Sequence, residues 1–200
     1  MAKQKYLKFE GRILMVGFGS VAQGLLPLLL RHIDVPANRI SIITGDDGGR
    51  DEANAFGVQF EVNPLTRDNY RAVLDTRLAR GDFLINLSVD VCSAALIEIC
   101  CERGALYLDT CIEPWPGGHT DPSLSPSQRS NYGQREGALA LRARFPKGPT
   151  AVLTHGANPG LISQWVKQGL VNLARDILEQ TEIPTTQSEW AHLAMGLGIK

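Results

Sequence analysis

Short apolar runs alternate with polar segments along the chain and predict a series of strands and helices. Residues 13–16 are all apolar, which is typical of a strand buried on both faces of a parallel sheet. Similar apolar or alternating runs predict further strands, at residues 40–43, 58–62, 83–90, 105–113 and 150–154. Helical segments separate these runs, so the pattern predicts an α/β fold with a doubly wound parallel sheet.

The predicted helices complete this picture and suggest where one region ends and the next begins. They are expected at residues 20–31, 52–56, 66–80, 94–103, 125–145, 161–174 and 186–196. Ser125 with Gln128, and Thr186 with Glu189, have the spacing of capping boxes. We expect residues 12–150 to form a nucleotide-binding domain, and residues 151–200 to hold the end of its sheet and the start of a second, substrate-binding domain.

A glycine-rich turn follows the first buried strand and leads directly into a helix. Gly17 permits a tight turn, Gly19 allows the backbone to approach a pyrophosphate, and Ala22 or Gly24 allows the helix to lie close to the strand. The amides at the start of that helix favour a phosphate. The turn therefore predicts a Rossmann-type dinucleotide site, and a tight turn without a ligand is the alternative. The cofactor contacts predicted here are Gly17, Gly19, Ser20 and Val21.

The end of the second predicted strand bears on which dinucleotide is bound. An acidic side chain at this place commonly binds the ribose hydroxyls, and here Thr44 is followed by Asp46 and Asp47. We choose Asp46 for the ribose, although a solvated turn explains the same residues. No arginine stands directly at the strand end to meet a 2′-phosphate, so NAD is favoured modestly over NADP.

Polar residues also stand where later strands end. Ser88 and Asp90 lie at the carboxyl end of one predicted strand, and Asp109 and Thr110 lie toward the end of the next. Because ligands of open parallel sheets bind beyond the carboxyl ends of the strands, we expect Ser88, Asp109 and Thr110 to contact the cofactor. The two aspartates serve equally well as helix caps. A Pro/Gly-rich loop then runs to Pro122, and its length is typical of a functional lid.

Composition and charge exclude several classes of partner. The 44% hydrophobic content and 200 residues suffice for one α/β domain and a fragment. The net charge is −1 and no basic cluster occurs, which argues against nucleic acid or a membrane surface as the main partner. No apolar run is long enough to span a bilayer, and no signal segment is visible, so a cytoplasmic location is expected. The four cysteines lack metal-site spacing, and no metal is predicted.

Several motifs, taken together and in order, are more specific than the glycine turn. They are Met15-Val-Gly-Phe-Gly-Ser20, Asn86-Leu-Ser-Val-Asp90, Tyr107-Leu-Asp-Thr110, Glu113-Pro-Trp115, Arg129-Ser-Asn-Tyr132 and Gly156-Ala-Asn-Pro-Gly160. With them the chain resembles the bacterial homospermidine synthases, a branch of the saccharopine dehydrogenase-like superfamily. The resemblance runs from about residue 11 to residue 200. Members of that family are longer, so the chain resembles their N-terminal part.

The resemblance implies a reaction and its partners. Two putrescine molecules, or putrescine and spermidine, give a longer polyamine and ammonia. NAD takes a hydride from putrescine, the resulting imine exchanges its amine, and the new imine takes the hydride back. The cofactor is thus recycled with no net redox change, and the protein orients it and excludes water. A homodimer is also implied.

Glu113 and Trp115 are the expected substrate contacts. A diamine carries two ammonium groups, and removing one from water is costly unless a carboxylate or an aromatic face meets it. Glu113 and Trp115 supply both types just beyond a strand end, and Glu113 matches an acidic pocket residue of the resembled family. The alternatives are a solvated carboxylate for Glu113, and an anchor of the loop on the core for Trp115.

The loop at residues 155–160 supplies the remaining candidates. Asn158 matches an asparagine that lies near nicotinamide and substrate in the resembled family, and its amide can donate or accept a hydrogen bond. His155 is the histidine placed to accept a proton from an alkylammonium. A simple Asn-Pro-Gly turn and a structural histidine are the alternatives. His32, His119 and His192 have no partner that the sequence reveals and are given no role.

Two other functions remain open from the sequence. One is a saccharopine dehydrogenase-like NAD(P) oxidoreductase with net hydride transfer, which would change nicotinamide absorbance steadily during turnover. The other is a non-catalytic NAD-binding module, if the chain is complete at 200 residues, since a fold does not settle a function. In either case the chain alone is expected to bind NAD and to be incomplete for the synthase reaction.

Overall fold

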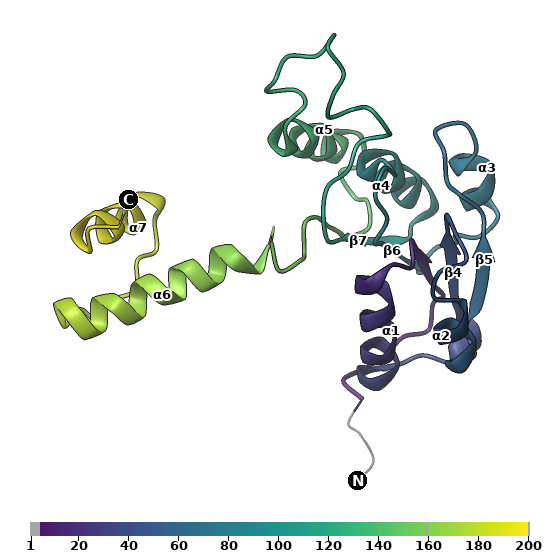
Figure 1. Cartoon of the computed structure of the whole chain (residues 1–200), viewed down its shortest axis with the longest axis horizontal. Helices are drawn as coiled ribbons and strands as arrows, with labels where there is room; N and C mark the ends of the chain where they lie inside the picture. Colours follow the sequence, from purple (N-terminus) through teal and green to yellow (C-terminus); the bar gives the residue numbers. More distant parts are fainter. Residues whose placement is uncertain (1–4, 159, 200) are drawn as a thin grey trace. The chain divides into compact units, whose positions relative to one another are not determined.

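The computed structural model describes residues 5–158 and 160–199 and contains two compact units (Figure 1). The first ends at Thr154 and the second begins at His155. The first unit contains the whole six-stranded sheet. The last strand, which was predicted within residues 151–200, therefore belongs to the first unit. The second unit is helical.

A six-stranded sheet, parallel throughout, forms the centre of the first unit, which confirms the predicted fold class. Its spatial order is β5 (Gln59–Val62), β4 (Ile40–Thr44), β2 (Ile13–Val16), β6 (Phe83–Asn86), β7 (Leu106–Asp109) and β8 (Ala151–Val152). From β2 the chain adds strands first on one side, then on the other. The direction reverses between β2 and β6, and in open sheets the ligand crevice lies beyond the carboxyl ends at such a point.

Helices cover both faces of this sheet because the strands are apolar on both sides. Ile13 and Met15 face one core, and Leu14 and Val16 face the other. The first core is covered by α1 (Ser20–His32) and α2 (Arg50–Ala55), and the second by α3 (Tyr70–Asp75), α4 (Ser93–Arg103) and α5 (Asn131–Arg144).

Local details differ from the sequence predictions. Residues 7–8, expected in a polar lead-in, form β1 (Leu7–Lys8), which pairs with β3 (Ile33–Asp34), and a short 3-10 helix, η1 (Ala37–Arg39), precedes β4. The helix predicted at 66–80 is only α3, because Thr66 and Asn69 bond each other in a separate turn before it. The Ser125–Gln128 pair likewise closes its own turn, and α5 begins later with Ser130 as its cap.

The second unit is a pair of helices, α6 (Leu161–Leu178) and α7 (Gln187–Gly196). The predicted capping box of Thr186 and Glu189 is present at the start of α7. Its core is small, and among the described residues Leu170, Ala174 and Leu193 form the buried cluster between the helices. Across the described residues of both units, no helix combines the length and apolar character that crossing a bilayer requires.

Candidate cofactor and substrate site

Gly17 directly follows β2 and is fixed by its surroundings. Its φ is 83°, and its amide donates a hydrogen bond to the Ile43 carbonyl at 2.8 Å. A Cβ atom here would lie 2.7 Å from the Cα of Ser88 on the neighbouring strand's extension. Only glycine fits both the conformation and the space, as the predicted tight turn requires.

Gly19 is open where Gly17 is crowded. A Cβ atom on Gly19 would find no protein atom within 4 Å, and no side chain caps the amides at the start of α1. Ser20 and Val21, which follow, are exposed. This uncapped, unobstructed helix start fits a diphosphate. The close packing against the sheet comes from Ala22, which is fully buried, and not from Gly24, which is exposed with open space around it.

A cleft of about 170 Å³ lies beyond the carboxyl ends of the central strands. Gly17, Thr44, Ser88 and Asp90 are among the residues that line it. This is the crevice expected at the point where strand order reverses, so the turn and the strand ends are brought together as predicted.

Asp46 lies outside the residues that line this cleft. Its side chain is exposed and accepts a hydrogen bond from the Gly48 amide at 2.8 Å, which leaves carboxylate capacity unused. Asp47 pairs with Arg50, whose guanidinium lies 4.7 Å from the centre of the Phe60 ring. Arg50 is the first cation after this strand end in the sequence, and its guanidinium already contacts a carboxylate and an aromatic ring of the protein itself. The ribose contact by Asp46 stays a prediction.

A chain of hydrogen-bonded polar groups, buried in the middle and half-buried at its two ends, runs across the strand ends next to the cleft. Ser88 donates its hydroxyl to Asn86, and the Asn86 amide donates to the Tyr107 hydroxyl at 3.3 Å. Tyr107 in turn donates to Asp109 at 2.8 Å, and the Thr154 amide donates to the other Asp109 oxygen at 2.6 Å. The chain thus joins Ser88, which lines the cleft, to the last residue of the first unit.

Asp109 lies in the interior and not on the cleft surface. Its side chain is fully buried, and burial raises the pKa of the carboxyl against the opposing effect of its hydrogen bonds. Burial also raises the pKa of Tyr107 well above its ordinary value. Because both Asp109 oxygens have partners inside the protein, its position gives no support to the predicted cofactor contact. Thr110, which follows, is half-buried.

Glu113 is held at the start of α4 by a reciprocal pair of bonds. The Ser93 amide donates to the Glu113 carbonyl at 2.8 Å, and the Glu113 amide donates to the Ser93 hydroxyl at 3.0 Å. The Glu113 side chain is 15% exposed, so the alternative of a fully solvated carboxylate is wrong. Burial, reinforced by this carboxylate, raises the pKa of the neighbouring Cys111 to about 11.

His119, for which no role was predicted, is the partner of Glu113. Its Nε2 atom lies 3.7 Å from a Glu113 carboxylate oxygen, and its Nδ1 atom lies 2.9 Å from the Arg129 carbonyl oxygen. The proline- and glycine-rich loop folds back to bring the two side chains together. The sequence shows that Glu113 and His119 belong to the same loop, which makes a contact between them conceivable. It does not show that the loop folds back, so the contact itself could not be predicted.

Trp115 takes the anchoring role that was the alternative for it. It is 8% exposed, and its ring centre lies 5.2 Å from that of Tyr70. It belongs to the core beneath α4 and α5. The ring is therefore already packed, and its position does not support the predicted stacking on a substrate ammonium.

The loop that carries His155 and Asn158 opens the second unit. Both side chains are exposed, and amides of the first turn of α6 donate to the Gly156 and Ala157 carbonyls at 2.8 and 2.9 Å. Pro159, part of the predicted motif, lies outside the described residues. Because this loop and Glu113 belong to different units, the catalytic roles of His155 and Asn158 stay predictions.

Comparison with known protein families identifies the family to which the first unit belongs. A sequence model of the family described as the saccharopine dehydrogenase NADP binding domain matches residues 13–152, a range that runs from the first to the last strand of the sheet. The chain belongs to this family. The family description fits the uncapped helix start and the open space at Gly19, because both suit a dinucleotide diphosphate.

Individual relatives of this saccharopine dehydrogenase-like chain are homospermidine synthases. The chain is 48% identical over 198 residues to the homospermidine synthase of Blastochloris viridis and 38% identical over 200 residues to that of Mesorhizobium japonicum. Each alignment covers 98% of this chain, but 42% and 41% of those relatives, so the chain spans about two fifths of their length. The resemblance inferred from the motifs is therefore confirmed over the compared region.

A solved relative extends the likeness to three dimensions. The crystal structure of the homospermidine synthase of Legionella pneumophila in complex with NAD matches with a TM-score of 0.78 and 38% identity, over 96% of this chain and 39% of that one. The saccharopine dehydrogenase-like fold is thus shared with a protein that holds NAD.

Sequence reasoning missed the buried chain of polar groups within this domain. Tyr107 and Asp109 stand two residues apart on β7, so they lie on the same side of the strand. That spacing of polar groups in an apolar strand is a usable signal. The hydrogen bond between Asp109 and Thr154 leaves no such signal, because the two residues are 45 positions apart in the sequence.

Proposed function

We propose that this chain is the NAD-binding part of a homospermidine synthase, which joins two putrescine molecules, or putrescine and spermidine, with release of ammonia. The observation that carries the proposal is the likeness to two homospermidine synthases over 98% of the chain. The open helix start beside Gly19 supports it independently.

The residues of the glycine turn would hold the cofactor. The backbone of Gly17, Gly19, Ser20 and Val21 would receive the diphosphate, with Ser88 and Asp90 bordering the same cleft. When bound, NAD supplies a hydride acceptor that can return the hydride, so that no net oxidation occurs. The solved relative with NAD favours NAD over NADP.

Glu113 would bind an ammonium group of the diamine. Its carboxylate is largely shielded from water, and a carboxylate in such a place offsets the cost of removing an ammonium from solvent. His119 beside it is able to hold a proton near the amine. Asn158 and His155 remain proposed contacts of the reacting end of the substrate.

The proposal concerns a protein longer than the chain described. Because the chain spans about two fifths of its curated relatives, further groups of the amine pocket would come from the remaining part. A homodimer and a cytoplasmic location, expected from the resemblance and the composition, belong to the same proposal.

The deciding experiment uses the full-length gene product with putrescine and catalytic amounts of NAD. Mass spectrometry is expected to detect homospermidine, while nicotinamide absorbance stays constant during turnover. Steady accumulation of the reduced cofactor without homospermidine would instead support a saccharopine dehydrogenase-like oxidoreductase. Absence of any turnover, with NAD bound, would support a binding module.

Replacement of Glu113 by Gln tests the amine site within the same protein. We expect KM for putrescine to rise about 10- to 100-fold, since a hydrogen bond to a charged group contributes roughly 1.5–3 kcal/mol, with NAD affinity unchanged. Glu136→Gln, at an exposed position on α5, is the matched control and should leave both constants unchanged. Equal loss of NAD and putrescine binding in Glu113→Gln would indicate misfolding and contradict the assignment.

A further inference from the structure

The buried carboxylate of Asp109 has no cationic partner among the described residues. Its oxygens are bonded to the Tyr107 hydroxyl at 2.8 Å and to the Thr154 amide at 2.6 Å. Burying a carboxylate costs free energy that an apolar side chain at the same position would not cost. Packing alone therefore does not explain an aspartate at position 109. What the carboxylate provides is a fixed link between β7 and the residue at which the first unit ends.

Thr154 is held in a conformation that its residue type disfavours. Its φ is 54°, in the left-handed region, and a β-branched residue is rarely found there. Such a conformation persists only where the surroundings impose it. The hydrogen bond from its amide to Asp109 is one such constraint. The next residue, His155, begins the second unit and the loop that carries Asn158.

The other end of the same chain of bonds lies at the cofactor cleft. The Tyr107 hydroxyl accepts from the Asn86 side-chain amide, and the Asn86 side-chain oxygen accepts from both the hydroxyl and the backbone amide of Ser88. Ser88 lines the cleft and packs against Gly17. One buried network therefore connects the backbone beside the glycine turn with the strained residue at the boundary between the units.

We propose that Asp109 is a positioning residue that holds Thr154 in its strained conformation, and so fixes the backbone direction in which the chain leaves the first unit and enters the loop that carries Asn158. The inference rests on the proposed synthase function for its effect on turnover.

Relief of the strain gives the first test. In the full-length protein, Thr154→Gly is expected to raise the melting temperature or leave it unchanged, because glycine adopts a positive φ without strain. Turnover of putrescine is expected to fall about 10- to 100-fold, as misplacement of a catalytic group by about 1 Å does. A residue with only a structural role would not show stability and turnover moving apart.

Two control variants isolate this effect. Thr154→Ala removes the hydroxyl but keeps the disfavoured conformation, so its turnover should stay within about twofold of wild type. Glu179→Gly relieves a comparable φ of 53° at the end of α6 and should not lower turnover. Turnover of Thr154→Gly equal to that of these controls would overturn the proposal.

The second test does not depend on activity. Asp109→Ala removes both acceptor oxygens, so the Tyr107 hydroxyl and the Thr154 amide both lose this partner. Amide hydrogen exchange of the segment 153–158 should become about tenfold faster with exchange of β6 unchanged. Unchanged exchange in that segment would contradict the link. If the wild-type protein makes no homospermidine, the proposed function fails, and this measurement still decides the positioning role.

Discussion

Gly17 and Gly19 stand two residues apart and serve different purposes, which mutation can separate. A Cβ atom at Gly17 would collide with the Ser88 backbone at 2.7 Å, whereas one at Gly19 would meet no protein atom within 4 Å. Gly19→Val should therefore leave the fold intact but abolish NAD binding by occupying the space of the diphosphate. Gly17→Ala should destabilise the fold by about 1–3 kcal/mol through strain and overpacking.

Calorimetric titration with NAD and denaturant unfolding distinguish these two effects. Gly57→Ala is a useful control, because Gly57 also has a positive φ, at 68°, but no neighbour that a Cβ atom would strike. It should show a smaller loss of stability and normal NAD affinity. Unchanged NAD affinity in Gly19→Val would contradict the proposed diphosphate site.

Asp82 illustrates a carboxylate that stabilises the fold and not the site. Burial alone would raise its pKa, but hydrogen bonds from the Arg12 side chain and from the Arg12 and Ala79 amides hold the pKa below its ordinary value. A lowered folded-state pKa means that the stabilisation is present above the unfolded value of about 3.9 and is lost as the pH falls through the folded value.

Asp82→Asn should accordingly lower the free energy of unfolding by about 1–3 kcal/mol at pH 7. The estimate is kept low because the Arg12 side chain is half exposed, so solvent screens its charge. The difference from wild type should shrink as the pH is lowered from 5 toward 2, when both proteins carry a neutral group. Urea unfolding at several pH values measures this. A difference that is independent of pH would show that the charge is not responsible.

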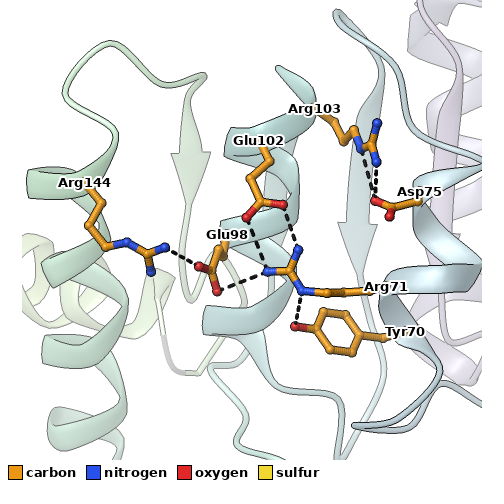
Figure 2. Close-up of polar contacts among 7 residues, drawn as sticks. All are labelled: Tyr70, Arg71, Asp75, Glu98, Glu102, Arg103 and Arg144. Carbon is orange, nitrogen blue, oxygen red and sulfur yellow. Dashed lines mark hydrogen bonds and ion pairs between the residues drawn. The ribbon is translucent and has the colours of Figure 1, made fainter.

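At the scale of helices, a network of charges joins α3, α4 and α5 (Figure 2). Glu98 on α4 contacts Arg144 of α5 at 2.6 Å and Arg71 of α3 at 3.6 Å, and Arg71 also contacts Glu102 at 2.8 Å. Hydrogen bonding to Glu102 raises the pKa of Arg71. Because Glu98 is shared by two cations and is 21% exposed, it is the centre of the network.

Glu98→Ala should destabilise the first unit by about 0.5–1.5 kcal/mol, more than Glu136→Ala, whose partner Arg135 is its immediate neighbour in sequence. The difference in stability between Glu98→Ala and Glu136→Ala should become smaller in 1 M salt, since ionic screening weakens such pairs. Thermal unfolding at low and high salt checks this, together with a double-mutant cycle of Glu98 and Arg144. A coupling energy of zero would show that the contact does not hold α4 to α5.

The elements differ in how far the sequence determines them. Apolar strands such as β2 were predictable because burial on both faces requires a continuous apolar run. β1 and β3 were not, because two-residue strands leave no period to detect. Helix starts were misplaced where residues able to cap a helix closed a separate turn instead, as Ser125 does before α5.

At the scale of the whole molecule, the site was predictable in part. The glycine turn and the polar strand ends could be placed because parallel strands bring their carboxyl ends to one edge. The pairing of Glu113 with His119 and the burial of Trp115 depend on how a loop folds back, which no local pattern records. The link from Asp109 to Thr154 joins distant segments and was beyond reach for the same reason.

The two units should differ in their ability to fold alone, because their cores differ in size. The first unit has two apolar cores on the faces of its sheet, whereas the buried cluster between the helices of the second consists, among the described residues, of Leu170, Ala174 and Leu193. A fragment of residues 1–154 should therefore unfold cooperatively and bind NAD, since it retains the glycine turn and the Thr154 amide bonded to Asp109.

Residues 155–200 alone should be mostly unfolded in water, because two helices with so small a core bury too little apolar surface. Circular dichroism of both fragments, with calorimetric titration of NAD into the first, measures these expectations. The 1–154 fragment carrying Gly19→Val is the control for specific binding. A cooperatively folded second fragment, or a first fragment that fails to fold, would show that the units depend on each other in a way that their separate cores do not explain.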